Sequence, residues 1–324
     1  MQALQTKSNE ISVKYKNRKE FEEELFKLLD SIILAPDFLS DIISKEIDDD
    51  FIKKIKVLDE KLSIFANEES LPESFAIDEI VPEMRKTLAK VCSKIYGYIL
   101  NALLMINKPN TNIQILQKHY IQKNAVLISF LKKHAISMYK ELVNKYTALM
   151  EKIYSALTTK YCQELNRLIY DKHDKFSLIS SDELNKDLFL LVNERKKNIL
   201  KEIEKESIVP VIAQKSKSQY FYEQIFQSIN KYIMELVTWE VLFFSQFFDM
   251  NPQFSISYLN SIFKNSVSYI FDNIQKSIIN KCNDFFAISL IIIVNHEQTK
   301  IMENMKINHL DLYFGKYIII CTLN

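Results

Sequence analysis

The sequence predicts an all-α protein made of elongated helices followed by a helical-bundle domain. The chain has 324 residues but only 2 glycines and 6 prolines, whereas average usage would give roughly 20 and 16. So few turn-forming residues argue against β-sandwiches and against the glycine-rich phosphate loops of nucleotide-binding folds. The stretches between the prolines mix apolar and polar residues at helical spacing. We therefore expect long helices separated at prolines 36, 72, 82, 109, 210 and 252.

Two N-terminal segments carry apolar residues at alternating spacings of three and four, typical of a helix that packs lengthwise on another helix. The first seam is Phe21, Leu25, Leu28 and Ile32, and the second is Phe51, Ile55, Leu58, Leu62 and Phe65. A third such run covers 88–106. An apolar stripe must be covered, and the spacing allows either the same chain or partner helices to cover it. The nine residues of the first two seams are our candidate partner-binding residues.

The rest of the chain also reads as helical. Apolar residues recur about every 3.7 residues after Pro109, which predicts a rod-like helix over 119–170, roughly 78 Å long if unbroken. A connector at 171–181 and a charged helix at 182–206 follow. Aromatic residues lie on every face of 220–248, so this helix should be surrounded by others, with two more helices at 254–281 and 283–304. We predict three regions: assembly helices at 1–108, a long rod and connector at 109–206, and an aromatic-rich bundle at 207–324.

Composition gives no support for catalysis, metal binding or nucleic-acid binding. The 42 basic and 41 acidic residues leave a net charge of +1, whereas nucleic-acid binding needs a clustered basic surface. Three adjacent carboxylates at 48–50 would point about 100° apart on a helix, so a solvated turn is the better interpretation. Neither the four cysteines (Cys92, Cys162, Cys282 and Cys321) nor the five histidines have metal-ligand spacing. We expect no catalytic residue, no metal and no cofactor.

Four arginines (Arg18, Arg85, Arg167 and Arg195) are the side chains able to bind a carboxylate with two parallel hydrogen bonds. The N-terminus lacks the apolar core of a signal peptide. The longest apolar run, 285–294, is half the length that crosses a bilayer. We therefore expect a cytosolic protein with, at most, peripheral membrane association.

One segment resembles a known family. Residues 108–117 (KPNTNIQILQ) resemble the Lys-Pro-x-Thr-Asn-x-Gln-Ile-x-Gln signature of the vacuolar protein sorting-associated protein fifty-two family. The residues that continue the resemblance on either side are Lys94, Ile95, Glu141, Tyr146, Lys152, Ile153, Tyr154, Tyr161, Tyr220, Glu223, Ile225, Phe226, Ser228, Glu240, Phe247, Phe248, Cys282, Asp284, Ala287, Leu310, Asp311 and Tyr313. Asn17, Arg18, Leu58 and Asp59 fit less specifically. Gln227 stands where the family usually has Arg, so an ion pair made there should be lost.

The resemblance implies a non-catalytic subunit of a multisubunit vesicle tether: the Golgi-associated retrograde protein complex or its endosomal recycling counterpart. Its N-terminal helices would bundle with the other subunits, and its further partners would be a Rab GTPase and SNARE proteins. Its place would be the cytosolic face of the trans-Golgi network and endosomes. The family continues beyond Tyr317 into more helical domains, whose functions are not assigned to this chain.

The signature segment itself we interpret as a structural corner. Pro109 disfavours helix at Lys108, and Thr111, Asn112 and Gln114 can satisfy the backbone groups freed at the helix ends. Two other functional classes remain open from the residues alone. One is a free-standing helical scaffold or adaptor. The other is an all-helical lipid-binding protein or enzyme with a cavity among the aromatics of 220–248.

Overall fold

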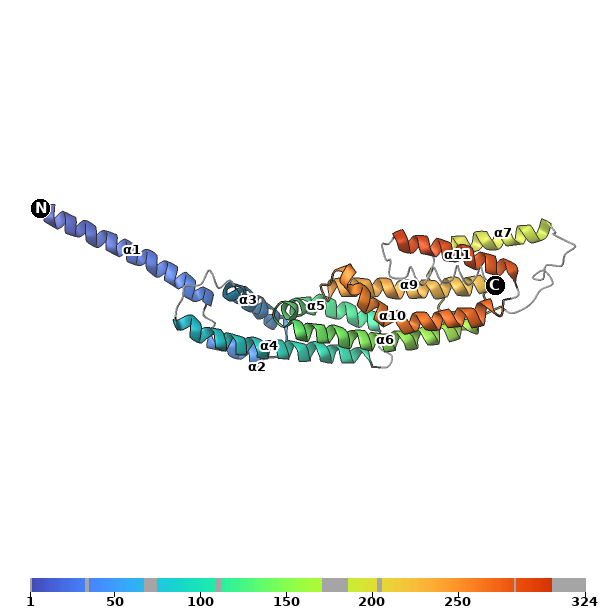
Figure 1. The fold of residues 1–324 in the computed structure, drawn as a ribbon, viewed down its shortest axis with the longest axis horizontal. Coiled ribbons are helices and arrows are strands. Elements are labelled where there is room, and N and C mark those ends of the chain that lie inside the picture. Colours follow the sequence, from blue (N-terminus) through green and yellow to red (C-terminus); the bar gives the residue numbers. More distant parts are fainter. Residues whose placement is uncertain are drawn as a thin grey trace. The chain divides into compact units, whose positions relative to one another are not determined.

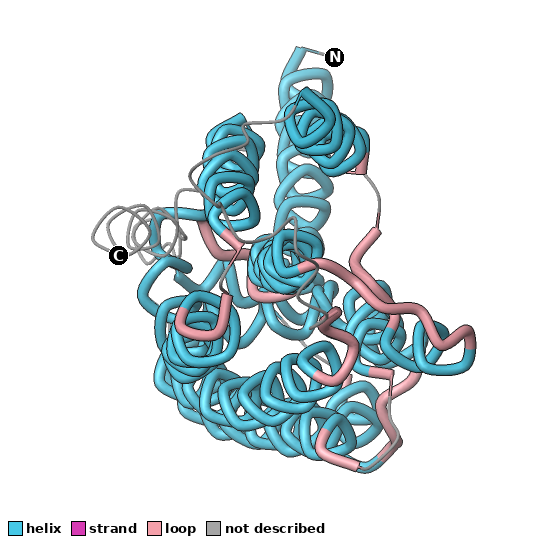
Figure 2. The backbone as a smooth tube through the Cα atoms, turned by 90° about the vertical axis from the view of Figure 1, so that its right-hand side faces the viewer, coloured by secondary structure: helices cyan, strands magenta, loops and turns pink. Residues whose placement is uncertain are grey.

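A computed structural model describes residues 2–32, 35–66, 75–108, 112–170, 186–202, 206–282 and 284–304. Contacts divide the chain into two compact units, Met1–Leu142 and Val143–Asn324. Throughout the described ranges the regular elements are helices, and Ile169 and Tyr220 add a single parallel bridge (Figure 2). The predicted all-α class is therefore confirmed. The three predicted regions follow composition and periodicity, whereas the contacts divide the chain between Leu142 and Val143.

The first unit contains α1 (Gln2–Ile32), α2 (Pro36–Ser44), α3 (Asp49–Ala66), α4 (Phe75–Ile106), α5 (Ile113–His134) and the start of α6 (Ile136–Asn166) (Figure 1). Helix α3 packs on α1, α2 and α5, and α4 packs on α2 and α5. The completely buried core residues include Ile42, Ile55, Val91, Ile95, Leu127 and Leu131. The second seam, the run at 88–106 and the apolar run after Pro109 thus contribute to one apolar core.

Lys94 holds α2 to α4. Its Nζ donates to the backbone carbonyls of Ile42, at 2.8 Å, and Lys45, and it lies 4.7 Å from the centre of the Phe51 ring. The final carbonyls of a helix have no partner within the helix, and a lysine is well suited to them because of their partial negative charge. Burial lowers the pKa of Lys94. The lysine that precedes the signature segment therefore has a structural role.

The helix expected over 119–170 is divided into two helices, so the length of roughly 78 Å for an unbroken helix does not apply. Helix α5 ends at His134, Ala135 has φ −143° and ψ 63°, and α6 begins at Ile136. Two residues of the last turn of α5 bind the carboxylate of Asp59 on α3, Lys133 at 2.8 Å and His134 at 2.6 Å. These contacts fix the end of α5 on α3. They depend on a residue 74 positions earlier in the chain than Lys133, which is why local periodicity does not reveal the break.

The second unit contains most of α6, followed by α7 (Lys186–Lys201), α8 (Pro210–Lys215), α9 (Tyr222–Gln246), α10 (Pro252–Ile274), the π-helical turn η2 (Gln275–Ile279) and α11 (Phe285–Asn304). Helix α9 packs on α10 and α11, and α7 packs on α11. The buried aromatics of α9 and its end are Phe226, Phe243, Phe244, Phe247 and Phe248. The expectation that this helix is surrounded by others is confirmed. The predicted connector at 171–181 lies outside the described residues.

Helix boundaries show how a chain so poor in glycine ends its helices. Pro36, Pro210 and Pro252 each begin a helix, a position where proline costs no hydrogen bond. Pro82 instead lies inside α4, so the boundary expected there is absent. After α8 and α9 the left-handed backbone conformation is taken by Lys217, with φ 53°, and Asp249, with φ 48°. Glycine is the usual residue there, so neither end carries that signal, although the helix predicted over 220–248 agrees with the observed end of α9 to within two residues.

Candidate assembly surface

The first seam lies on α1, which contacts α3 but keeps its described side chains exposed over most of its length. Every side chain of α1 from Lys7 to Lys27 is exposed, including Phe21 at 69% and Leu25 at 40%. The side chains of Leu28 and Ile32 lie outside the described residues. Exposed phenylalanine and leucine at seam spacing are typical of a surface that a partner helix covers. The assignment of Phe21, Leu25, Leu28 and Ile32 to partner binding remains a prediction.

The second seam is covered by this chain. Phe51, Ile55, Leu58 and Leu62 are at most 9% exposed, because α3 packs between other helices of the first unit. The side chain of Phe65 lies outside the described residues. Of the two ways to cover a seam, packing within the chain thus accounts for these four residues. Of the two seams, the first, on α1, is the one whose described side chains are exposed to a partner.

The pattern of α1 extends further toward the N-terminus than apolar spacing reveals. Continuing the three-four spacing upstream from Phe21 gives Arg18, Lys14, Ile11 and Lys7. An apolar pattern does not reveal these residues, because three of the four are basic. All four are exposed, so a partner that covers Phe21 and Leu25 would meet charged side chains as well.

The signature segment forms a helix start. Asn112 is the N-cap of α5, and its Oδ1 accepts a hydrogen bond from the backbone N–H of Ile115 at 3.1 Å. On the other side, the last turn before the corner is closed by the N–H of Lys108, which donates to the carbonyl of Met105. Residues 109–111 lie outside the described residues. The structural role expected for Asn112 is confirmed.

The tyrosines that carry the resemblance meet in the interior of the second unit. Glu240 on α9 is completely buried and accepts hydrogen bonds from the hydroxyls of Tyr146, at 2.7 Å, and Tyr154, at 2.5 Å. Further along α6, the hydroxyl of Tyr161 donates to the carbonyl of Ile208 at 3.0 Å and lies 2.7 Å from Ser228 Oγ. The rings of Tyr146 and Phe243 are stacked with centres 5.0 Å apart. These residues hold α6 on α9.

A second polar cluster attaches α7. Arg195 binds both carboxylate oxygens of Glu223 through Nη2, at 2.8 and 2.9 Å, and binds Asp284 through Nη1 at 2.8 Å. Glu223 is 2% exposed, and a buried carboxylate needs such a partner. Gln227 makes no ion pair and donates instead to the carbonyl of Ile199 on α7 at 3.3 Å. Glu223, one helical turn before Gln227, nevertheless keeps a cationic partner in Arg195.

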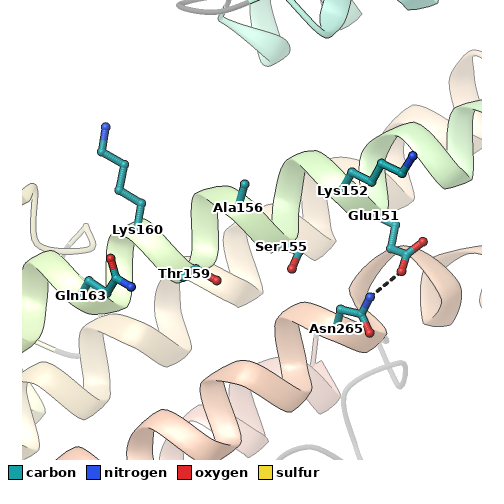
Figure 3. A pocket seen from close by; sticks show the side chains of 8 residues that line it. All are labelled: Glu151, Lys152, Ser155, Ala156, Thr159, Lys160, Gln163 and Asn265. Atoms are coloured by element: carbon teal, nitrogen blue, oxygen red, sulfur yellow. Dashed lines mark hydrogen bonds between the residues drawn. The ribbon is translucent and has the colours of Figure 1, made fainter.

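An open recess of about 560 Å³ lies along α6 (Figure 3). It is lined by Glu151, Lys152, Ser155, Ala156, Thr159, Lys160, Gln163 and Asn265. Glu151 accepts a hydrogen bond from Asn265 at 2.5 Å, and the hydroxyls in the lining have no histidine beside them. In the described part of the chain, no three His, Cys, Asp or Glu side chains are placed to hold a metal ion. The recess contains no arrangement of nucleophile and base.

The described cysteines are buried and weakly acidic. Burial raises the pKa of Cys92 and of Cys282 to about 11, and that of Cys162 to about 12. Because the thiolate is the reactive form, we expect these three thiols to react with a disulfide reagent at pH of about 8 far more slowly than a free thiol. Unfolding should restore the normal rate. Stopped-flow thiol titration with and without denaturant measures this, and fast labelling of Cys162 in the native protein would contradict the packing of the second unit.

Helix α4 is also long and apolar enough over Glu79–Ile106 to meet length and composition criteria for crossing a bilayer. Core helices meet the same criteria. Here Val91, Cys92, Ile95 and Ile99 are buried within a unit in which α4 packs on α2 and α5. Packing accounts for the apolar residues on the buried face of α4, whereas Leu104 and Met105 are exposed.

Comparison with known proteins gives two family matches that together span the chain. The family model described as "Vps52/Sac2 family, coiled-coil" matches residues 1–131, and the one described as "Vps52, C-terminal" matches residues 133–321. Similar relatives are vacuolar protein sorting-associated protein 52 A of Arabidopsis thaliana, 31% identical over 97% of this chain, and the human homolog of protein 52, 22% identical over 98%. The chain spans about half the length of these relatives, 45% and 46% respectively.

No solved structure matches the chain. The boundary between the two family matches, at residue 132, falls in the last turn of α5, close to the break at Ala135. The match at 133–321 alone covers more than half of the residues, and it includes the tyrosines of α6 and Glu240 on α9. The chain therefore belongs to the Vps52 family.

Proposed function

We propose that this chain is a non-catalytic subunit of a multisubunit tether that acts in vesicle sorting. The observation that carries the proposal is α1, a 31-residue helix whose described side chains from 7 to 27 are all exposed and include a seam of apolar residues. An isolated helix gains little stability in water from its own hydrogen bonds. A helix that is exposed on every side and carries an apolar seam is best explained by packing against helices of other subunits.

Membership of the Vps52 family supports the specific assignment. The relatives are named for vacuolar protein sorting, and tethering needs reach and several weak contacts rather than an active site. We propose retrograde transport from endosomes to the trans-Golgi network as the process, with peripheral attachment to the cytosolic face of these membranes. A Rab GTPase and SNARE proteins are the proposed partners on the membranes.

The test replaces two seam residues of α1, Phe21→Asp with Leu25→Asp, in the full-length chain expressed in its own cells. Both side chains are exposed, so the free energy of unfolding should change by less than about 0.5 kcal/mol. The other subunits should be lost from the affinity-purified complex, since a charge now faces the partner's apolar residues. Quantitative mass spectrometry of the purified complex measures the loss, and fluorescence microscopy should show the variant leaving Golgi and endosomal membranes.

The matched control is Val13→Asp with Phe26→Asp. These side chains are 58% and 66% exposed and lie on the same helix away from the seam, so the change in charge and in apolar surface is equivalent. The control should retain the other subunits. Equal loss in both variants would contradict the seam, and retention of every subunit by the Phe21 and Leu25 variant would refute assembly through α1.

A free-standing helical adaptor is the second candidate, because burial of the α3 seam shows that much of the N-terminal region covers itself. It predicts that the wild-type chain purifies from its own cells without other subunits and sediments as a single species when expressed alone. The proposed subunit should instead bring a constant set of chains with it.

A further inference from the structure

The basic residues of α1 occupy positions that a packed partner would cover. In the heptad that contains Phe21 and Leu25, the two seam positions are filled by Ile11, Arg18 and Leu25 at one and by Lys7, Lys14 and Phe21 at the other. All six side chains are exposed. Lysine or arginine at a seam position costs stability unless the partner offers an opposite charge, and such residues select the partner and its register.

The charge along α1 is also divided. Residues 7–19 contain five basic side chains and one acidic side chain, whereas residues 20–30 contain five acidic side chains and one basic. The helix dipole acts within the first and last turns of a helix, and the five basic residues lie beyond the first turn of α1, so the dipole does not account for this division. Stability of α1 by itself therefore does not explain the pattern, and a charged partner does.

A second copy of α1 fits this pattern poorly. Parallel pairing in register would stack Lys7, Lys14 and Arg18 on the same residues of the copy. Antiparallel pairing places one seam position opposite the other, and the register that stays within residues 7–25 sets Lys14 of each copy against Arg18 of the other. Like charges facing each other in an interface cost several kcal/mol.

The next antiparallel register would remove that repulsion but would need residues 28 and 32. The continuous stretch of exposed, described side chains on α1 ends at residue 27, so this register reaches beyond it (Figure 1). The exposed stretch of α1 is therefore matched to a helix with a different sequence.

We propose that α1 binds a helix of another chain that presents acidic side chains opposite Lys14 and Arg18, and apolar side chains opposite Ile11, Phe21 and Leu25. This inference rests on the proposed function, because it takes α1 as the assembly helix, and it adds the chemistry by which the partner is selected. The acidic stretch that begins at Glu20 would then face basic residues of the same partner.

The first experiment reverses the charge at the seam, Lys14→Glu with Arg18→Glu, in the full-length chain. The matched control, Lys16→Glu with Lys19→Glu, changes the net charge of the same helix by the same amount at exposed positions outside the seam. We expect the seam variant to retain about ten-fold less of the co-purified subunits than the control. Circular dichroism and urea unfolding should be equal for both, because neither pair contributes to a core.

The second experiment identifies what lies opposite the seam. A photoreactive benzoylphenylalanine in place of Phe21 should cross-link, within the purified complex, to a helix of another chain that has Asp or Glu within one turn of the labelled residue. A cross-link to α1 of a second copy, or to a segment without acidic residues, would overturn the inference.

The two proposals fail in different ways. If charge reversal at Lys14 and Arg18 leaves the complex intact while Phe21→Asp with Leu25→Asp dissolves it, the charge inference is wrong and the proposed function stands. If the wild-type chain brings no other subunit, the proposed function fails and the inference fails with it.

Discussion

Replacing Leu58 by Asp is expected to unfold the first unit. Leu58 is 1% exposed and lies in the α3 seam, so the substitution removes a core side chain and buries a carboxylate without a partner. We expect a loss of more than about 4 kcal/mol in the free energy of unfolding. Urea unfolding followed by circular dichroism measures the loss. Labelling of Cys92, which is buried in the same unit, should become fast.

The control for this substitution is Leu25→Asp, which places the same charge at a leucine of the other seam. Leu25 is 40% exposed, so its replacement should leave the unfolding curve and the labelling of Cys92 unchanged. A stable Leu58→Asp protein would show that α3 does not pack as described and would return the second seam to the set of partner-binding surfaces.

Replacing Glu240 by Ala is expected to destabilise the second unit by about 3 kcal/mol or more. The substitution removes the carboxylate that accepts hydrogen bonds from Tyr146 and Tyr154 and leaves space in a buried region. An unsatisfied hydroxyl in such a place costs its desolvation energy. Thiol labelling of Cys162 in urea isolates the response of this unit, since Cys162 is buried within it.

Glu235→Ala is the matched control, because Glu235 lies on the same helix and is exposed. Its effect should stay within about 0.5 kcal/mol. The single variants Tyr146→Phe and Tyr154→Phe, combined with Glu240→Ala in double-mutant cycles, should each show coupling with the carboxylate. Additive effects would mean that the tyrosines are held by their rings alone.

The positions of the helices followed from the sequence wherever a residue acts locally. Pro36 and Pro252 begin helices because proline fits the first turn of a helix and disfavours helical backbone at the residue before it. Asn112 caps α5 through its own side chain. The break at Ala135 has no such local cause, since it depends on Asp59 binding the last turn of α5. Likewise, no glycine marks the ends at Lys217 and Asp249.

The candidate site was predictable only in part. An apolar seam indicates that another helix packs on it, but it does not identify whether that helix belongs to the same chain or to a partner. Leu25 and Leu58 both belong to seams of the same spacing, yet Leu25 is exposed and Leu58 is buried. The difference comes from α2 and α5, which pack on α3, whereas the side chains of α1 from residue 7 to residue 27 are exposed. Several residues quoted for the family resemblance have a structural role instead. Lys94, Asp59 and Glu240 proved to be the polar contacts that fix helices on one another.

The pairing of Tyr146 and Tyr154 with a single carboxylate has a consequence for how α6 and α9 find their alignment. Apolar contact has no preferred direction, so apolar surfaces alone would let α6 and α9 pack with their axes shifted by one helical turn at little cost in free energy. The two hydroxyls come from points on α6 about 12 Å apart along its axis, and they converge on Glu240 in one axial setting alone. A shift of α6 along α9 would leave the two hydroxyls and the carboxylate buried without these hydrogen bonds. Tyr146, Tyr154 and Glu240 therefore favour one axial alignment of α6 on α9 over shifted alignments during folding.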